Sequence, residues 1–81
     1  MPTIFRIRHG YAVRIYPNDH RPPHVHVVGP ETEARFELLC DQGAVRLTDN
    51  YGFSRGRLNA IAQELIDRLV DLCDAWGTIH G

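Results

Sequence analysis

The sequence predicts an α+β fold, a four- or five-stranded, largely antiparallel sheet packed on one face by a long C-terminal helix. Two observations predict it. Residues 3–47 consist of short segments in which apolar and polar residues alternate, which is the period of a half-buried strand. Residues 54–76 repeat their apolar residues every three or four positions, as a helix with one buried face does. Because the chain has only 81 residues, we expect a single domain, 1–81, with one small core.

The strand region contains five alternating segments separated by turn-forming residues. They are residues 3–8, 11–16, 24–28, 33–39 and the short 44–47. His9-Gly10 suits a tight hairpin, because both residues tolerate a positive φ better than most. Pro22-Pro23 imposes an extended approach to the third segment and removes two backbone donors. The alternation directs one apolar set toward the helix: Phe5, Ile7, Val13, Ile15, Val25, Val27, Phe36 and Leu38.

The helical region begins at Ser54, a good N-cap residue, and is expected to run to about Trp76. Its apolar seam consists of Leu58, Ala62, Leu65, Leu69, Leu72 and Trp76. This seam favours packing on the sheet, and a homodimer seam is the alternative. The pattern is also compatible with a break into two helices.

The N-terminus lacks the apolar stretch of a signal peptide, and no segment is long enough to span a membrane, so we expect a cytoplasmic protein. The two cysteines, Cys40 and Cys73, are too few for a disulfide framework and lack a metal-type spacing. We expect both to be free thiols, with Cys73 buried in the helical pattern. A catalytic thiol is the alternative.

The net charge of −1 conceals a segregation of charge along the chain. Residues 1–30 carry four arginines against one aspartate, a net charge of +3, whereas residues 31–50 carry −3 and residues 51–81 carry −1. All nine basic residues are arginines, which make planar, bidentate contacts with phosphate and carboxylate. The net charge of the whole chain therefore argues only against an anionic partner that covers the whole protein surface.

The sheet face opposite the helix is expected to be rich in arginine and histidine. The alternation places on it Arg6, Arg8, Arg14, Tyr16, His24, His26, Glu33, Arg35 and Glu37. Such a face suits an anionic ligand or RNA. A solvated face with Arg–Glu cross-strand pairs is the alternative.

The segment Asn18-Asp19-His20-Arg21-Pro22-Pro23-His24-Val25-His26-Val27 is the strongest candidate for a site, because it holds three of the five histidines. His24 and His26 lie two positions apart on a strand, so their side chains leave the same face with Cα atoms about 6.5–7 Å apart. One possible role is a Zn²⁺ site with His20 or Asp19 as third ligand and a water in the open position. Acid–base cleavage of a phosphodiester is the second, in which arginine stabilises the developing charge. A third is a rigid rim packed against Tyr16.

Three other residues around this segment have simpler expected roles. Asp19 either caps the turn through its side chain or orients a histidine. His9 is expected to be a turn residue, and His80 to be solvated at the C-terminus.

The chain resembles a small bacterial family called "domain of unknown function 4160". The resemblance is carried by Met1-Pro2-Thr3-Ile4, by the diproline with His24-Val25-His26, by Gly52-Phe53-Ser54 before the helix and by Trp76. The family usually has an acidic residue before the first motif histidine, a position that Asp19 matches. The resemblance implies a stand-alone protein, often encoded beside a "domain of unknown function 2442" protein and proposed from that neighbourhood as a toxin–antitoxin component. It supplies no established catalytic residues.

Two functional hypotheses follow. In the first, the chain is a ribonuclease-like toxin in which His20, His24, His26 and Arg21 carry the chemistry and Arg6, Arg8, Arg14, Tyr16 and Asp19 contribute to binding. In the second, it is a non-catalytic regulatory module whose His-Pro-Pro rim and helix seam dock a small protein encoded next door. Zinc at His24 and His26 is compatible with both hypotheses.

Overall fold

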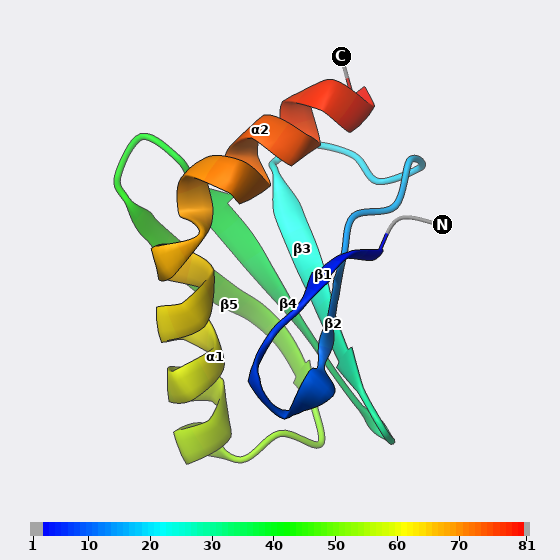
Figure 1. Ribbon diagram of the computed structural model, residues 1–81, viewed down its shortest axis with the longest axis vertical. Helices are drawn as coiled ribbons and strands as arrows, with labels where there is room; N and C mark the ends of the chain where they lie inside the picture. The colour runs from blue at the N-terminus through cyan, green and yellow to red at the C-terminus, as the bar shows by residue number, and fades with distance from the viewer. Residues whose placement is uncertain (1–2, 81) are drawn as a thin grey trace.

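The computed structural model describes residues 3–80, except for the side chains of residues 3–5 and 8. A five-stranded antiparallel sheet is followed by two helices (Figure 1). The elements are β1 (Thr3–Arg6), a 3-10 turn (Arg8–Gly10), β2 (Ala12–Arg14), β3 (His24–Gly29), β4 (Thr32–Leu39), β5 (Ala44–Tyr51), α1 (Arg55–Asp67) and α2 (Leu69–His80). The strands are neighbours in the order of the chain, so the sheet is a meander. Among the described residues, the helices are too short or too polar to cross a membrane.

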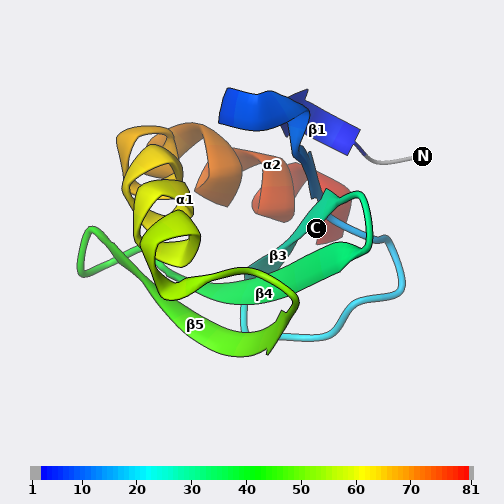
Figure 2. The ribbon, with the colours of Figure 1, turned by 90° about the horizontal axis from the view of Figure 1, so that it is seen from below.

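The core lies between one face of the sheet and the two helices (Figure 2). Val13, Val25 and Val27 are completely buried, and Ile7, Ile15, Ala34, Phe36 and Leu38 join them from the strands and loops. The helices contribute Ile61, Leu65, Leu69, Leu72 and Trp76 to the same cluster. The predicted alternation is therefore confirmed for these residues, whereas the Phe5 side chain lies outside the described ones.

The first hairpin turns where the sequence predicts it. His9 has φ 68° and Gly10 has φ 77°, the left-handed conformation that a tight turn requires. The Arg57 guanidinium also donates to His9 Nε2, so His9 additionally joins this turn to α1. The two flanking strands are shorter than predicted. Ile7 and Tyr11 lie outside both strands, and the Ile7 N–H donates to Tyr11 O at 2.9 Å within the turn.

The prediction for the fifth strand is wrong, because β5 continues through residues 48–51, which we expected to form a loop. These four residues are exposed and polar, apart from Tyr51, so they lack the alternation that reveals a strand. They pair with β4 through the backbone, with Asp49 opposite Arg35 and Tyr51 opposite Glu33. The longer strand therefore places Asp49 and Tyr51 beside Arg35 and Glu33 of β4.

The prediction of one helix ending near Trp76 is also wrong. Ser54 caps α1, since its hydroxyl accepts the Arg57 N–H at 3.2 Å, but the helix stops at Asp67. Arg68 leaves the helical conformation, and α2 then continues in a new direction to His80. A straight helix over 54–76 would be about 34 Å long, whereas the longest extent of the whole molecule is 33 Å. The break lets both halves of the apolar seam reach the core.

The two cysteines are not free thiols, which corrects a further prediction. Cys40, just after β4, and Cys73, in α2, form a disulfide with Cα atoms 6.3 Å apart. Sequence spacing concealed the pair, because 33 positions separate the two residues and the contact between α2 and the end of β4 is formed only in the folded chain. The cytoplasmic location stays a prediction.

Candidate functional site

The loop between β2 and β3 places Asp19 beside the polar face of the sheet. The Asp19 backbone N–H donates to Tyr16 O at 3.0 Å, and the Tyr16 N–H donates to Asp19 Oδ2 at 3.3 Å. Beyond a cis Arg21–Pro22 peptide, Pro23 O accepts the Leu38 N–H at 2.8 Å, which fixes the start of β3. The loop is therefore tied at both ends, and Asp19 both caps the turn and faces the histidines.

Asp19, His24 and His26 converge on one point. Asp19 Oδ2 lies 3.2 Å from His24 Nε2 and 3.1 Å from His26 Nε2. The potential ligand atoms of the three residues all lie within 4.8 Å of one another. The three side chains are only 13–19% exposed, so solvent screens their mutual interactions weakly. We call these three residues the Asp–His–His cluster.

The Nδ1 atoms of His24 and His26, which are the ring nitrogens not facing Asp19, also have partners. His24 Nδ1 donates to Pro22 O at 2.9 Å, and His26 Nδ1 lies 3.4 Å from Glu33 Oε2. Tyr16 packs against the His26 ring with centroids 4.8 Å apart, and Trp76 lies 5.4 Å from the His24 ring. Contacts on both sides therefore fix the orientation of the two imidazoles.

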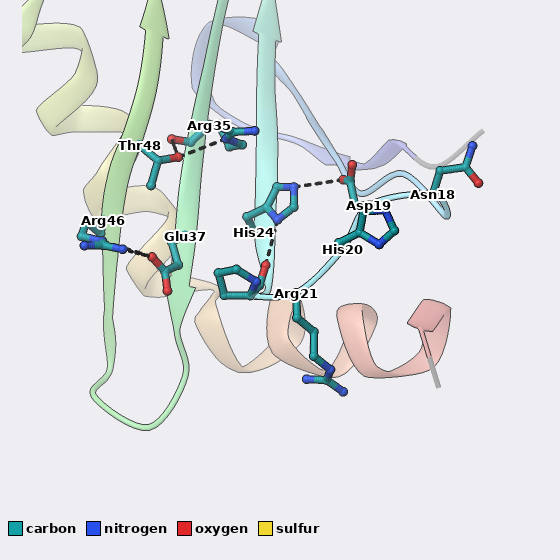
Figure 3. Close-up of a pocket in the computed structure, with 10 residues that line it drawn as sticks. Asn18, Asp19, His20, Arg21, His24, Arg35, Glu37, Arg46 and Thr48 are labelled. Carbon is teal, nitrogen blue, oxygen red and sulfur yellow. Dashed lines mark hydrogen bonds and ion pairs between the residues drawn. The ribbon is translucent and has the colours of Figure 1, made fainter.

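A pocket of about 440 Å³ opens beside the cluster (Figure 3). Its lining includes three arginines, Arg21, Arg35 and Arg46, from the loop, β4 and β5. Arg35 Nε donates to Thr48 Oγ1 at 3.2 Å, and Arg46 Nε donates to Glu37 Oε1 at 3.1 Å. Asp19 and His24 belong to the same lining. The volume suits a ligand the size of a nucleotide or smaller.

The structure brings together some of the predicted site residues and separates others. His24, His26, Asp19 and Tyr16 form one group, and Arg14 is paired with His26 in the sheet register. His20 and Arg21 line the pocket, but among residues 3–80 the His20 ring is not part of the convergent group.

The first strand contributes less than predicted. Arg6 Nη1 donates to Gly10 O at 2.9 Å within its own hairpin, and Arg6 is not one of the residues lining the pocket. Arg8 lies in the 3-10 turn, and its side chain is outside the described residues. The arginines that line the pocket therefore come from the β2–β3 loop, β4 and β5 and not from β1.

The prediction of a solvated His80 is wrong. Its ring stacks on Trp76 with centroids 3.7 Å apart, and its two nitrogens face Trp76 O and Tyr16 O, each at 3.2 Å. The extension of α2 past Trp76 makes this possible. His80 thus ties the end of α2 to the loop that carries Asp19.

Sequence reasoning missed Arg46, Glu37 and Thr48 as site residues. Arg46 and Glu37 are directly opposite in the β4–β5 register, and Thr48 Oγ1 donates to Arg35 O at 3.1 Å. The signal that would have found them is the Asp41-Gln42-Gly43 turn, because folding the chain there aligns Arg46 with Glu37. The polar end of β5 carried no comparable signal.

Comparison with known proteins identifies one family. The model of the family described as "Domain of unknown function (DUF4160)" matches residues 10–77, which include the whole cluster and its pocket. No curated protein and no solved structure matches the chain.

Proposed function

The chain belongs to the family described as "Domain of unknown function (DUF4160)", and we propose that it is a ribonuclease-like toxin that cleaves phosphodiester bonds in RNA. The proposed reaction is inferred from the chemistry of the site. The observation that carries the proposal is the position of the Asp–His–His cluster at the edge of a pocket with three arginines. The toxin role rests only on the resemblance to a family proposed as toxin–antitoxin components.

Each part of the pocket matches one requirement of the reaction. Arginine guanidiniums bind the phosphate and stabilise the negative charge that develops on it, as Arg21 and Arg35 do here. The cluster removes the proton from the 2′-hydroxyl, whose oxygen then attacks the phosphorus. His20, exposed in the same pocket, donates a proton to the 5′-oxygen as its bond to phosphorus breaks. The products are a cyclic phosphate and a free 5′-hydroxyl.

RNA cleavage by the purified full chain tests this proposal. We expect His20→Ala to reduce the rate at least tenfold and the double variant His24→Ala, His26→Ala to reduce it at least a hundredfold. His9→Asn is the matched control, because it changes a histidine outside the pocket and asparagine tolerates the positive φ there. Equal cleavage by the parent and the folded double variant would contradict the proposal.

A second candidate is a module that binds a small cognate protein. The predicted helix seam is not available for this, because its six residues are buried or half-buried in the core. Two other apolar side chains on the helices are exposed, Val70 at 75% and Ile66 at 37%, and they border a hollow of about 330 Å³ beside Cys40 and Cys73. This surface favours a protein partner.

Co-purification with the product of the neighbouring gene tests the second candidate. We expect Val70→Glu to abolish a stable complex and Arg35→Ala to leave it intact. A complex that is lost only on changing Arg35 would place the partner on the polar face instead, and the absence of any complex would contradict the candidate.

A further inference from the structure

We propose that the Asp–His–His cluster binds one divalent cation of the zinc class, through Asp19 Oδ2, His24 Nε2 and His26 Nε2. This inference deepens the proposed function by naming the cation of its site. It stands on the geometry of the cluster, and it can be tested without RNA.

The first argument concerns protons. The four ring nitrogens of His24 and His26 face three acceptor oxygens: Pro22 O beside His24 Nδ1, Glu33 Oε2 beside His26 Nδ1, and Asp19 Oδ2 beside both Nε2 atoms. Two neutral imidazoles carry only two N–H groups. Because a backbone carbonyl cannot donate, the His24 proton lies on Nδ1, and the lone pair of its Nε2 points toward a carboxylate. Without a cation between them, these atoms repel one another.

A metal ion removes this conflict. It takes the lone pairs of both Nε2 atoms and of Asp19 Oδ2, and each Nδ1–H remains free to donate outward. His24 then donates to a backbone carbonyl and His26 to the Glu33 carboxylate. These are the outer partners that metal-binding histidines usually have. The alternative is a pair of imidazolium ions that donate to Pro22 O and to the Asp19 and Glu33 carboxylates, which requires two like charges to lie close together at half-buried positions.

Two of the three separations between ligand atoms fit a small tetrahedral ion, and the third is no more than 4.8 Å. Nitrogen and oxygen ligands lie about 2.0–2.1 Å from zinc, so two of them at a tetrahedral angle are about 3.3–3.4 Å apart. The observed separations of Asp19 Oδ2 from the two Nε2 atoms, 3.2 Å and 3.1 Å, are close to that value. Calcium and magnesium prefer oxygen ligands, so two imidazoles disfavour both.

Three protein ligands leave a fourth tetrahedral position open, as in catalytic zinc sites. Two of the three ligands, Asp19 and His24, line the pocket that also holds the arginines. A zinc ion held there would supply a bound water of lowered pKa, which could act as the base for the 2′-hydroxyl. His20 is not a ligand of the proposed ion, so the site has two histidines and one aspartate and not three histidines.

Zinc titration of the tag-free full chain by calorimetry, in competition with a chelator, tests the inference. We expect one ion per chain and a loss of affinity of at least a hundredfold for His26→Ala. For Glu33→Gln, which changes only the outer partner of His26, we expect about a 10–100-fold loss. His20→Ala and His9→Asn should bind as the parent does. Co²⁺ in place of zinc should give the visible absorption of a tetrahedral site.

Several outcomes would overturn the inference: no one-to-one binding, equal affinity in His26→Ala, or a loss in His20→Ala as large as that in His26→Ala. Circular dichroism establishes that each variant is folded, and Asp19→Asn provides a second ligand variant if His26→Ala is not. Zinc binding without RNA cleavage would contradict only the proposed function. Cleavage that persists in chelator would contradict only the metal.

Discussion

The two faces of β3 differ in burial and in the chemistry of their side chains. Val25 and Val27 are completely buried among apolar neighbours, whereas His24 and His26 face a carboxylate, arginines and solvent. The apolar face determines where the strand lies, and the polar face therefore presents two imidazoles in a fixed relation. The comparison teaches that the core behind β3 positions the two histidines, whereas the loop between β2 and β3 supplies Asp19, His20 and Arg21.

The largest expected effect is a change on the inner face. Phe36→Ala removes a ring that is 2% exposed, directly beside Val25 in the sheet register, and should lower the free energy of unfolding by about 3–5 kcal/mol. Urea denaturation followed by circular dichroism measures it. A loss below about 1 kcal/mol would mean that this face does not form the core.

The disulfide comes next. Replacing Cys40 and Cys73 together with serine should lower the free energy of unfolding by about 3–4 kcal/mol, because the bond closes a loop across 33 positions of the chain. Neither cysteine belongs to the Asp–His–His cluster or lines its pocket, so we expect the zinc affinity of the folded variant to be unchanged. An equal midpoint of denaturation for the parent with and without reductant would show that the bond does not form.

The smallest effect on stability belongs to the outer face. Arg46→Gln breaks the ion pair with Glu37, but the Arg46 side chain is 66% exposed, so the loss should be below about 1 kcal/mol. The same change removes one of three positive charges from the pocket and should weaken the binding of a mononucleotide severalfold. An outer-face change that destabilises the chain as much as Phe36→Ala would abolish the contrast between the faces.

The sequence was informative where side chains alternate and uninformative where they do not. Its capping chemistry placed Ser54 at a helix start, and period-two alternation correctly separated His24 and His26 from Val25 and Val27. It could not reveal the end of β5, because residues 48–51 are held by backbone pairing with β4. The apolar spacing did not reveal the break at Arg68, because the same spacing suits a straight helix and a broken one.

The candidate site was predictable in part for the same reason. Local spacing indicated that the two histidines share a face, and nearness in the chain suggested Asp19 as their partner. Arg46 and Glu33 reach the site through strand pairing, and His80 reaches it through a helix turned by the break at Arg68. These contacts depend on long-range geometry, which local patterns do not encode.

Anomalous diffraction at the zinc edge, from crystals of the full chain grown with one equivalent of zinc, tests the central claim most directly. The account predicts one strong peak within bonding distance of Asp19 Oδ2, His24 Nε2 and His26 Nε2, with the open side toward the arginine pocket. A peak at His20 or His80 instead, or no peak between the three residues, would contradict it.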